Sequence, residues 1–112
     1  MIARVWRGWA RHADADAYER YFRAVVTPEL EAIPGFRGLV LLRRDDGEET
    51  ELMTMTYFGS MEAIGRFAGS DRSRAVVHEE ARRLLTRFDQ RAVHWRIVQG
   101  SCPDTVHYPG DS

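Results

Sequence analysis

The sequence of 112 residues contains no lysine, a single cysteine and no long apolar run. The absence of lysine excludes enzymes that form a Schiff base between a lysine amine and a carbonyl substrate. The lone Cys102 cannot form an intrachain disulfide. No run approaches the roughly 20 apolar residues of a membrane span or the apolar core of a secretory signal. These absences predict a small cytoplasmic protein.

Charge of one sign is also lacking. The chain carries 16 basic and 17 acidic residues, for a formal net charge of -1, and no segment has a long one-sided run, which disfavours a nucleic acid partner. The four histidines are too scattered to form a metal motif. No glycine-rich phosphate loop follows a predicted strand. We therefore expect no metal, flavin or nicotinamide.

The strongest local pattern lies in residues 36–58, FRGLVLLRRDDGEETELMTMTYF. The turn residues Asp45-Asp46-Gly47 separate two extended runs, which predicts a β-hairpin. Both runs are apolar on both faces of the strand. A chain this short has helices for only one face, so we expect the other to meet a second copy in a homodimer. The apolar residues are Leu39 to Leu42 in the first run, Leu52 and Phe58 on one face of the second, and Met53, Met55 and Tyr57 on its other face.

A strand and a helix are predicted before the hairpin. Residues 2–10 alternate as in a strand. The spacing of Asp16 and Glu19 fits a capping box at the start of an amphipathic helix. Pro28 interrupts this helix, so the helix either kinks near Thr27 or restarts there with Pro28 at its first position.

Two helical segments and a strand are predicted after the hairpin. Ser60 and Gly69 fit the two ends of a short helix. A stripe of apolar residues over 77–88 predicts a third helical segment. Residues 91–98 then alternate as a last strand.

The order strand, helix, strand, strand, helix, strand is the ferredoxin-like βαββαβ arrangement of α+β proteins, with an antiparallel four-stranded sheet. We expect one domain over residues 1–98. Residues 99–112 lack periodicity and are expected to form a tail that is mobile or packs on the partner copy.

Several segments carry a family resemblance: IARVWRG at the start, PELEAIPGFRGLVLLRR, ELMTMTYFGSMEAIGRFAG and AVVHEEARRLLTRFD. Over residues 2–98 the sequence resembles the antibiotic biosynthesis monooxygenase family of dimeric α+β barrel proteins. The resemblance implies dimers whose sheets pack face to face. Members of the family include oxygenases that oxidise aromatic, polyketide-like substrates without metal or flavin, haem-degrading enzymes, and many proteins with no known reaction, so the resemblance alone does not choose among these functions.

The cofactor-free branch implies a pocket with aromatic walls, a base and a cation. His78 and Arg82 are expected four positions apart on one helix beside its apolar stripe, as base and cation. Arg7 is the alternative cation. The alternative is that His78 and Arg82 lie on a solvent-exposed flank of the helix and pair there with neighbouring glutamates. The expected walls, for which core packing is the alternative role, are Trp6, Tyr57, Phe67 and Trp95.

The haem-degrading branch implies a histidine, a tryptophan and an asparagine. His78 lies near the place of the histidine, but Phe67 stands where the tryptophan is expected and Trp6 where the asparagine is expected. The leading hypothesis is therefore a cofactor-independent monooxygenase acting on an aromatic or quinol-like molecule. Haem binding through His78 and a non-catalytic, dimeric small-ligand-binding protein are the alternatives.

Overall fold

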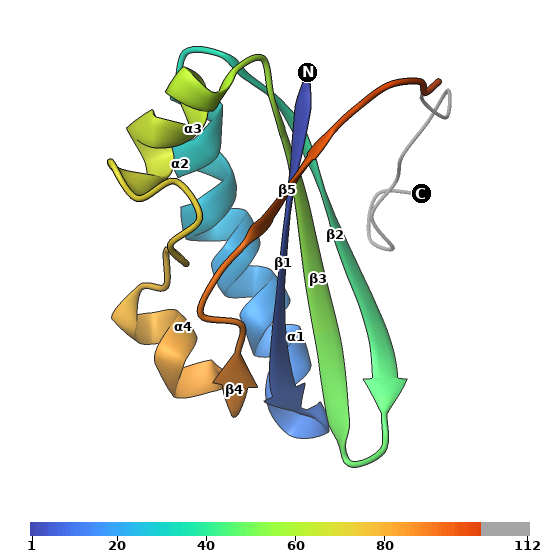
Figure 1. Cartoon of the computed structure of the whole chain (residues 1–112). Helices are drawn as coiled ribbons and strands as arrows, with labels where there is room; N and C mark the ends of the chain where they lie inside the picture. The colour runs from blue at the N-terminus through green and yellow to red at the C-terminus, as the bar shows by residue number, and fades with distance from the viewer. Residues whose placement is uncertain (102–112) are drawn as a thin grey trace.

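The structure is a computed structural model that describes residues 1–101. An antiparallel sheet carries the helices on one face, its inner face, which confirms the ferredoxin-like α+β class (Figure 1). The strand order is β2-β3-β1-β4, and β5 also pairs with β1. The elements are β1 (Ile2–Arg11), α1 (His12–Tyr21), the π-helix η1 (Phe22–Val26), α2 (Thr27–Glu31), β2 (Phe36–Asp46), β3 (Glu49–Phe58), α3 (Met61–Ala68), α4 (Glu79–Leu84), β4 (Arg87–Phe88) and β5 (Val93–Arg96).

The predicted hairpin is confirmed as β2 and β3. Asp46 pairs with Glu49, so the turn itself consists of Gly47 and Glu48, and Asp46 belongs to the strand. Gly47 has φ +65°, the left-handed conformation that glycine adopts without steric strain. The tight turn fixes the register of both strands.

The two faces of the hairpin differ in burial, as the alternation of side chains along the strands predicted. Leu52 and Phe58 on the inner face are buried in the core. The opposite, outer face is apolar but partly exposed, and Trp95 at its edge is 60% exposed. Besides the buried Ala3 and Trp9, pairing registers and strand alternation place eight partly or largely exposed apolar side chains there. We call them the outer apolar face: Val5, Val40, Leu42, Met53, Met55, Tyr57, Val93 and Trp95.

The first helix does not begin with the predicted capping box. It starts at His12 directly after β1, with Arg11 in the cap position and no side-chain cap. Asp16 and Glu19 instead both pair with Arg43 of β2, and the Asp16 Oδ1 to Arg43 Nη1 distance is 2.8 Å. These acidic side chains therefore link the helix to the sheet.

The helix continues through the expected interruption as a π-helix. Residues Phe22–Val26 form η1, and Pro28 then lies in the first turn of α2, where its missing N–H does least harm. Thr27 has helical dihedral angles and caps nothing. The wide turn keeps Phe22, Val26 and Leu30, spaced by four, on the side facing the sheet.

The later helices agree in part with prediction. Ser60 Oγ accepts from the Ala63 amide at 3.1 Å and Gly69 follows α3 with φ +84°, as expected. The helix predicted over 77–88 is wrong in extent, because α4 is confined to Glu79–Leu84. Its flanks still contact the core without being helical, since tertiary packing decides their conformation.

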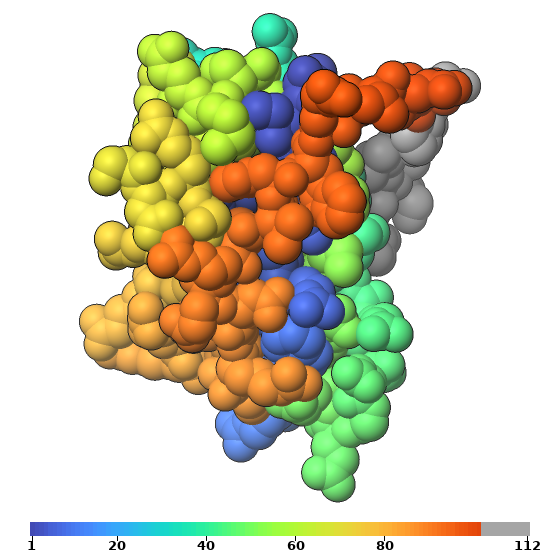
Figure 2. Space-filling view, viewed as in Figure 1, coloured from blue at the N-terminus to red at the C-terminus, as the bar shows by residue number. Residues whose placement is uncertain are grey.

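The last strand predicted over 91–98 is confirmed as the shorter β5, whereas β4 lies within the segment predicted as a helix over 77–88. The two strands pair with the two ends of β1. Between them the chain turns to the connection after α3, where Ala92 N donates to Ser73 O at 2.7 Å and Ala75 N donates to Gln90 O at 3.1 Å. Figure 2 shows this segment lying between that connection and β1. The predicted tail falls mostly on residues 102–112, outside the described residues.

Candidate functional site

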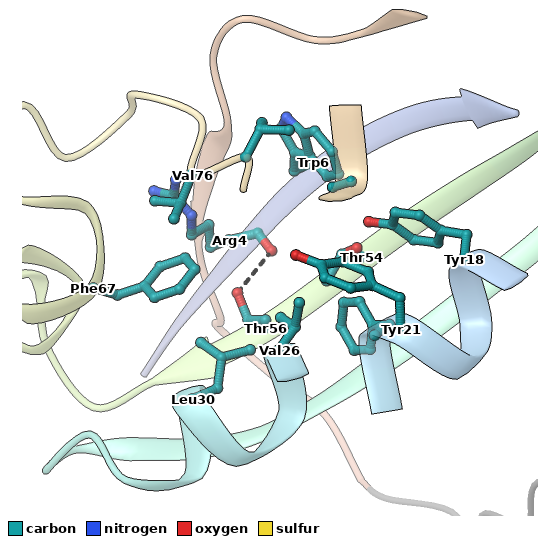
Figure 3. Close-up of a pocket in the computed structure, with 13 residues that line it drawn as sticks. Arg4, Trp6, Tyr18, Tyr21, Val26, Leu30, Thr54, Thr56, Phe67 and Val76 are labelled. Atoms are coloured by element: carbon teal, nitrogen blue, oxygen red, sulfur yellow. Dashed lines mark hydrogen bonds between the residues drawn. The ribbon is translucent and has the colours of Figure 1, made fainter. Parts of the chain in front are cut away.

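A cavity of about 50 Å³ lies between the inner face of the sheet and the long helical stretch from α1 to α2 (Figure 3). This volume holds a few water molecules. We call it the inner cavity. None of its lining residues is a carboxylate or a histidine. They are Arg4, Trp6, Tyr18, Tyr21, Phe22, Val26, Leu30, Thr54, Thr56, Phe67, Val76, Val77 and Ala81.

The cavity exists because side-chain size changes along β3. Its inward residues are Leu52, Thr54, Thr56 and Phe58, so two small threonines stand between two large apolar residues. Leu52 packs in the cluster around α1, whereas Phe58 packs in the cluster around α3. The space over the threonines lies between the two clusters.

Tyr18 and Tyr21 place two hydroxyl groups in the inner cavity. Both residues are buried, with rings 5.8 Å apart, and both hydroxyls point into the cavity in Figure 3. Burial raises the pKa of Tyr18, and burial together with the charges of Glu29 and Glu80 raises the pKa of Tyr21 to about 12. Both phenols therefore stay protonated at neutral pH and are hydrogen-bond donors.

Arg4 is a buried cation at the opposite end of the cavity. Only 4% of it is exposed. Its guanidinium donates to the carbonyl oxygens of Arg72 and Arg74, approaches His94 Nε2 at 2.9 Å, and lies 5.7 Å from the centre of the Phe67 ring. Burial lowers the pKa of Arg4 to about 10, so it is charged at pH 7. Within residues 1–101 it has no carboxylate partner.

A larger, open depression of about 540 Å³ adjoins the inner cavity. Phe67, Val76 and Val77 line both spaces and form the wall between them. Val76 and Val77 belong to the connection between α3 and α4, which is not helical. We call this space the outer depression. Its remaining lining includes Arg66, Arg74, His78, Arg82 and Phe88.

The predicted base and cation both lie at the outer depression, and neither lines the inner cavity. His78 was expected within the helix but immediately precedes α4. Its Nε2 lies 2.9 Å from the carboxylate of Glu29. The Arg82 guanidinium lies over the ring of Phe88, 5.2 Å from its centre.

The four expected aromatic walls are divided between the two faces of the sheet. Trp6 and Phe67 line the inner cavity, and the Trp6 Nε1 donates to the carbonyl oxygen of Asp89 at 2.7 Å. Tyr57 and Trp95 belong to the outer apolar face. The sheet therefore separates one pair from the other, and one ligand in the cavity cannot contact all four within a chain.

Arg4, Tyr18 and Tyr21 were not among the expected site residues. Arg4 did carry a signal, because a charged residue occupies an inward position of β1 between Ile2 and Trp6. The tyrosines carried none, since aromatic residues on the apolar face of a helix normally belong to the core.

The described part of the chain offers no obvious metal centre. Among residues 1–101, no three histidine, cysteine or acidic side chains come together in a way that could hold an ion. None of the helices in this range has both the length and the apolar character to cross a bilayer.

Solved structures share this fold at low sequence identity. Rv0793 from Mycobacterium tuberculosis is 23% identical, with 90% of this chain and 98% of that chain covered and a TM-score of 0.58. A putative antibiotic biosynthesis monooxygenase from Bacillus cereus is 14% identical, with coverage of 91% and 97% and a TM-score of 0.59. The heme-degrader MhuD from Mycobacterium tuberculosis, with two hemes bound in its active site, is 21% identical, with coverage of 91% and 100% and a TM-score of 0.58.

Sequence comparison agrees with the fold. No curated protein sequence matches the chain. The family model for antibiotic biosynthesis monooxygenase matches residues 1–79, from β1 through α3 to the edge of the outer depression. Because this match spans well over half of the 112 residues, the chain belongs to the antibiotic biosynthesis monooxygenase family.

Proposed function

We propose that the protein is a homodimeric, cofactor-independent monooxygenase that oxidises an aromatic or quinol-like small molecule. The observation that carries this proposal is the inner cavity, in which aromatic rings, hydroxyl groups that nothing in residues 1–101 hydrogen-bonds, and a buried cation surround one space. Apolar walls with a few placed polar groups are typical of small-molecule sites. Membership of the family supports the reaction class.

The side chains that line the cavity have different roles in such a reaction. Trp6 and Phe67 hold the planar ring by stacking and exclude water. The hydroxyls of Tyr18 and Tyr21 hydrogen-bond to ring oxygens. The positive charge of Arg4 stabilises the anions that form when an electron-rich ring reacts with dioxygen. The substrate supplies the electrons that reduce the second oxygen atom to water.

Binding requires the wall of Phe67, Val76 and Val77 to move, because about 50 Å³ is too small for an aromatic ring. Displacing this wall joins the inner cavity to the outer depression. His78 and Arg82 then lie at the mouth of one continuous site. In that position His78 acts as the base that deprotonates the entering phenol, and Arg82 is the cation that binds the resulting phenolate.

Oxygen uptake with a panel of dihydroxynaphthalenes tests the proposal. We expect consumption by the wild-type protein, and reduced turnover with unchanged thermal unfolding in His78→Ala. His12→Ala is the matched control, because His12 bonds Thr50 and Gly47 away from the cavity. Binding of a naphthol without oxygen uptake by the wild type would refute the oxygenase and indicate a non-catalytic ligand-binding protein.

Haem binding at the outer depression is the second candidate function. Its size and the presence of Arg66, Arg74 and Arg82 suit a porphyrin with two propionates, and MhuD, which shares the fold, binds haem. As positioned, His78 does not fit as an iron ligand, because Glu29 holds its Nε2. A hemin titration followed by absorbance separates the cases. A saturable Soret shift that is lost in His78→Ala supports haem, and no specific shift excludes it.

A further inference from the structure

Three hydroxyl groups gather in the inner cavity, and none of them has a hydrogen-bond partner within the described residues 1–101. Figure 3 shows the oxygens of Tyr18 and Tyr21 from α1 and of Thr54 from β3 around the same space. Among the described residues only Trp9 Nε1 is a fully buried side-chain polar atom without a partner, so the three hydroxyls face accessible space, where they can bond to water or a ligand. The cluster therefore marks a place where an oxygen-bearing ligand is favoured.

The protonation of these groups decides what they bind. Burial keeps the phenols of Tyr18 and Tyr21 protonated at neutral pH. A protonated phenol donates its hydrogen, so the two tyrosines present two O–H donors to one region. Donors that converge in a water-poor site favour an acceptor with negative charge, because charge-assisted hydrogen bonds are the stronger ones.

The positive charge of the cavity lining also favours an anionic ligand. Arg4 is the charged residue among those that line the inner cavity, and its described partners are two carbonyl oxygens and one imidazole. The imidazole of His94 has a lowered pKa, through burial and the charge of Arg4, and is neutral at pH 7. The positive charge of Arg4 is therefore not balanced by any described group in the lining.

We propose that the inner cavity binds the anion of a planar, acidic phenol or enol, with Tyr18 and Tyr21 donating to its oxygen and Arg4 balancing its charge. This inference rests on the proposed function and narrows its substrate to ring compounds that bind in ionised form. A delocalised anion suits the site, because its charge extends from the oxygen held by the tyrosines toward the guanidinium. Neutral aromatic rings of the same shape bind more weakly.

Equilibrium binding of two matched probes tests this inference without turnover. 2-Hydroxy-1,4-naphthoquinone is an anion at neutral pH, whereas its 2-methoxy ether has the same ring and no charge. Binding is followed through quenching of tryptophan fluorescence, to which Trp6 in the lining contributes. We expect the wild-type protein to bind the anion about tenfold or more tightly than the ether.

Tyrosine variants locate the binding. Tyr18→Phe and Tyr21→Phe remove one oxygen each and keep the buried ring, so the fold is retained. Each is expected to weaken binding of the anion about tenfold and to affect the ether much less, because a hydrogen bond to a charged group is lost. Tyr57→Phe is the matched control, since Tyr57 lies on the outer apolar face, and it should leave both affinities unchanged.

The outcomes also separate this inference from the proposed function. Equal affinity for anion and ether, no measurable binding of the anion, or unchanged binding in the double tyrosine variant would each overturn the anion site. Oxygen uptake with neutral substrates alone would overturn it and leave the oxygenase standing. Preferential binding of the anion that depends on both tyrosines, with no oxygen uptake from any substrate, supports the anion site and refutes the oxygenase.

Discussion

The Nη1 atom of Arg4 lies 2.9 Å from Nε2 of His94, and the two residues are directly opposite each other in the pairing of β1 with β5. Because the pKa of His94 is lowered by burial and by Arg4, the imidazole is neutral and its Nε2 accepts from the guanidinium. The first and last strands are thus joined by a bond that requires an uncharged histidine.

Acidification should weaken this bond. The pKa of His94 is lower in the folded than in the unfolded state, where it is about 6.5. Between the two values the unfolded state binds more protons, so the free energy of unfolding falls as pH drops below about 6.5. We expect the melting temperature of the wild type to fall more between pH 7.5 and pH 5 than that of His94→Gln. Parallel curves would contradict this, and His12→Gln controls for the loss of a histidine.

Replacing Arg4 by methionine should release the connection between α3 and α4. Arg4 donates to the carbonyl oxygens of Arg72 and Arg74, and methionine fills a similar volume without donors. We expect a loss of about 2 kcal/mol in the free energy of unfolding, because two carbonyls lose charged partners. Urea denaturation measures the loss, and hydrogen exchange should become faster in residues 72–75. Arg7→Met, which removes an exposed arginine of β1, should change neither much.

A charge on the outer apolar face should abolish the proposed dimer. Val93 is 53% exposed and lies in the row that pairs with Val5. Aspartate at this position is solvated in a monomer but must be desolvated between two sheets. We expect Val93→Asp to be monomeric by light scattering while remaining folded. Val98→Asp is the control, since Val98 is 81% exposed and follows the last strand. A monomeric wild type would remove the basis for this prediction.

Alanine at Gly35 should destabilise the fold more than alanine at Gly47. Both glycines have positive φ, +93° and +65°, and the strain of an L-residue there is about 1–2 kcal/mol. At Gly35 the added Cβ would also lie 2.7 Å from the Cβ of Ala63, whereas at Gly47 nothing lies within 4 Å. Thermal unfolding of the two variants compares the costs. Equal losses would mean that the close approach to α3 relaxes freely.

Removing the ring of Phe67 should open the inner cavity. Phe67 belongs to the wall shared with the outer depression. We expect Phe67→Ala to accelerate association of naphthoquinone probes in stopped-flow fluorescence, because less of the wall must move. Phe67→Leu retains most of the wall and should stay near the wild-type rate. An unchanged rate in both variants would place the entrance elsewhere.

Local sequence patterns predicted the fold where each signal depends on neighbours in sequence. Ser60 and Gly69 mark the ends of α3 because capping and positive φ are decided within one turn. Asp16 and Glu19 failed as a capping box because Arg43, distant in sequence, competes for their carboxylates. The stripe of apolar residues over 77–88 indicates which residues contact one hydrophobic core. It does not show that they are helical, because extended residues can pack against the same core cluster.

The site was less predictable than the fold, since it depends on which way side chains point. Trp6 and Phe67 were expected in the pocket and do line the inner cavity, whereas Tyr57 and Trp95 lie across the sheet. Alternation along a strand assigns faces only when the register is known. Tyr18 lies at a helical position where the sequence indicates only core packing, and its hydroxyl gains a role only because the small side chain of Thr54 leaves space beside it.

The π-helix η1 also constrains how this region can change in length. Deleting one residue within Phe22–Val26 would convert the wide turn into an ordinary α-helical turn, because a π-turn contains one residue more than an α-turn. Leu30 would then stay in the core, whereas a second deletion would rotate every residue beyond it by about 100° about the helix axis. Alignments of relatives should therefore contain gaps of at most one residue in this helix, whereas the turn at Gly47, which has open space around it, can accept insertions.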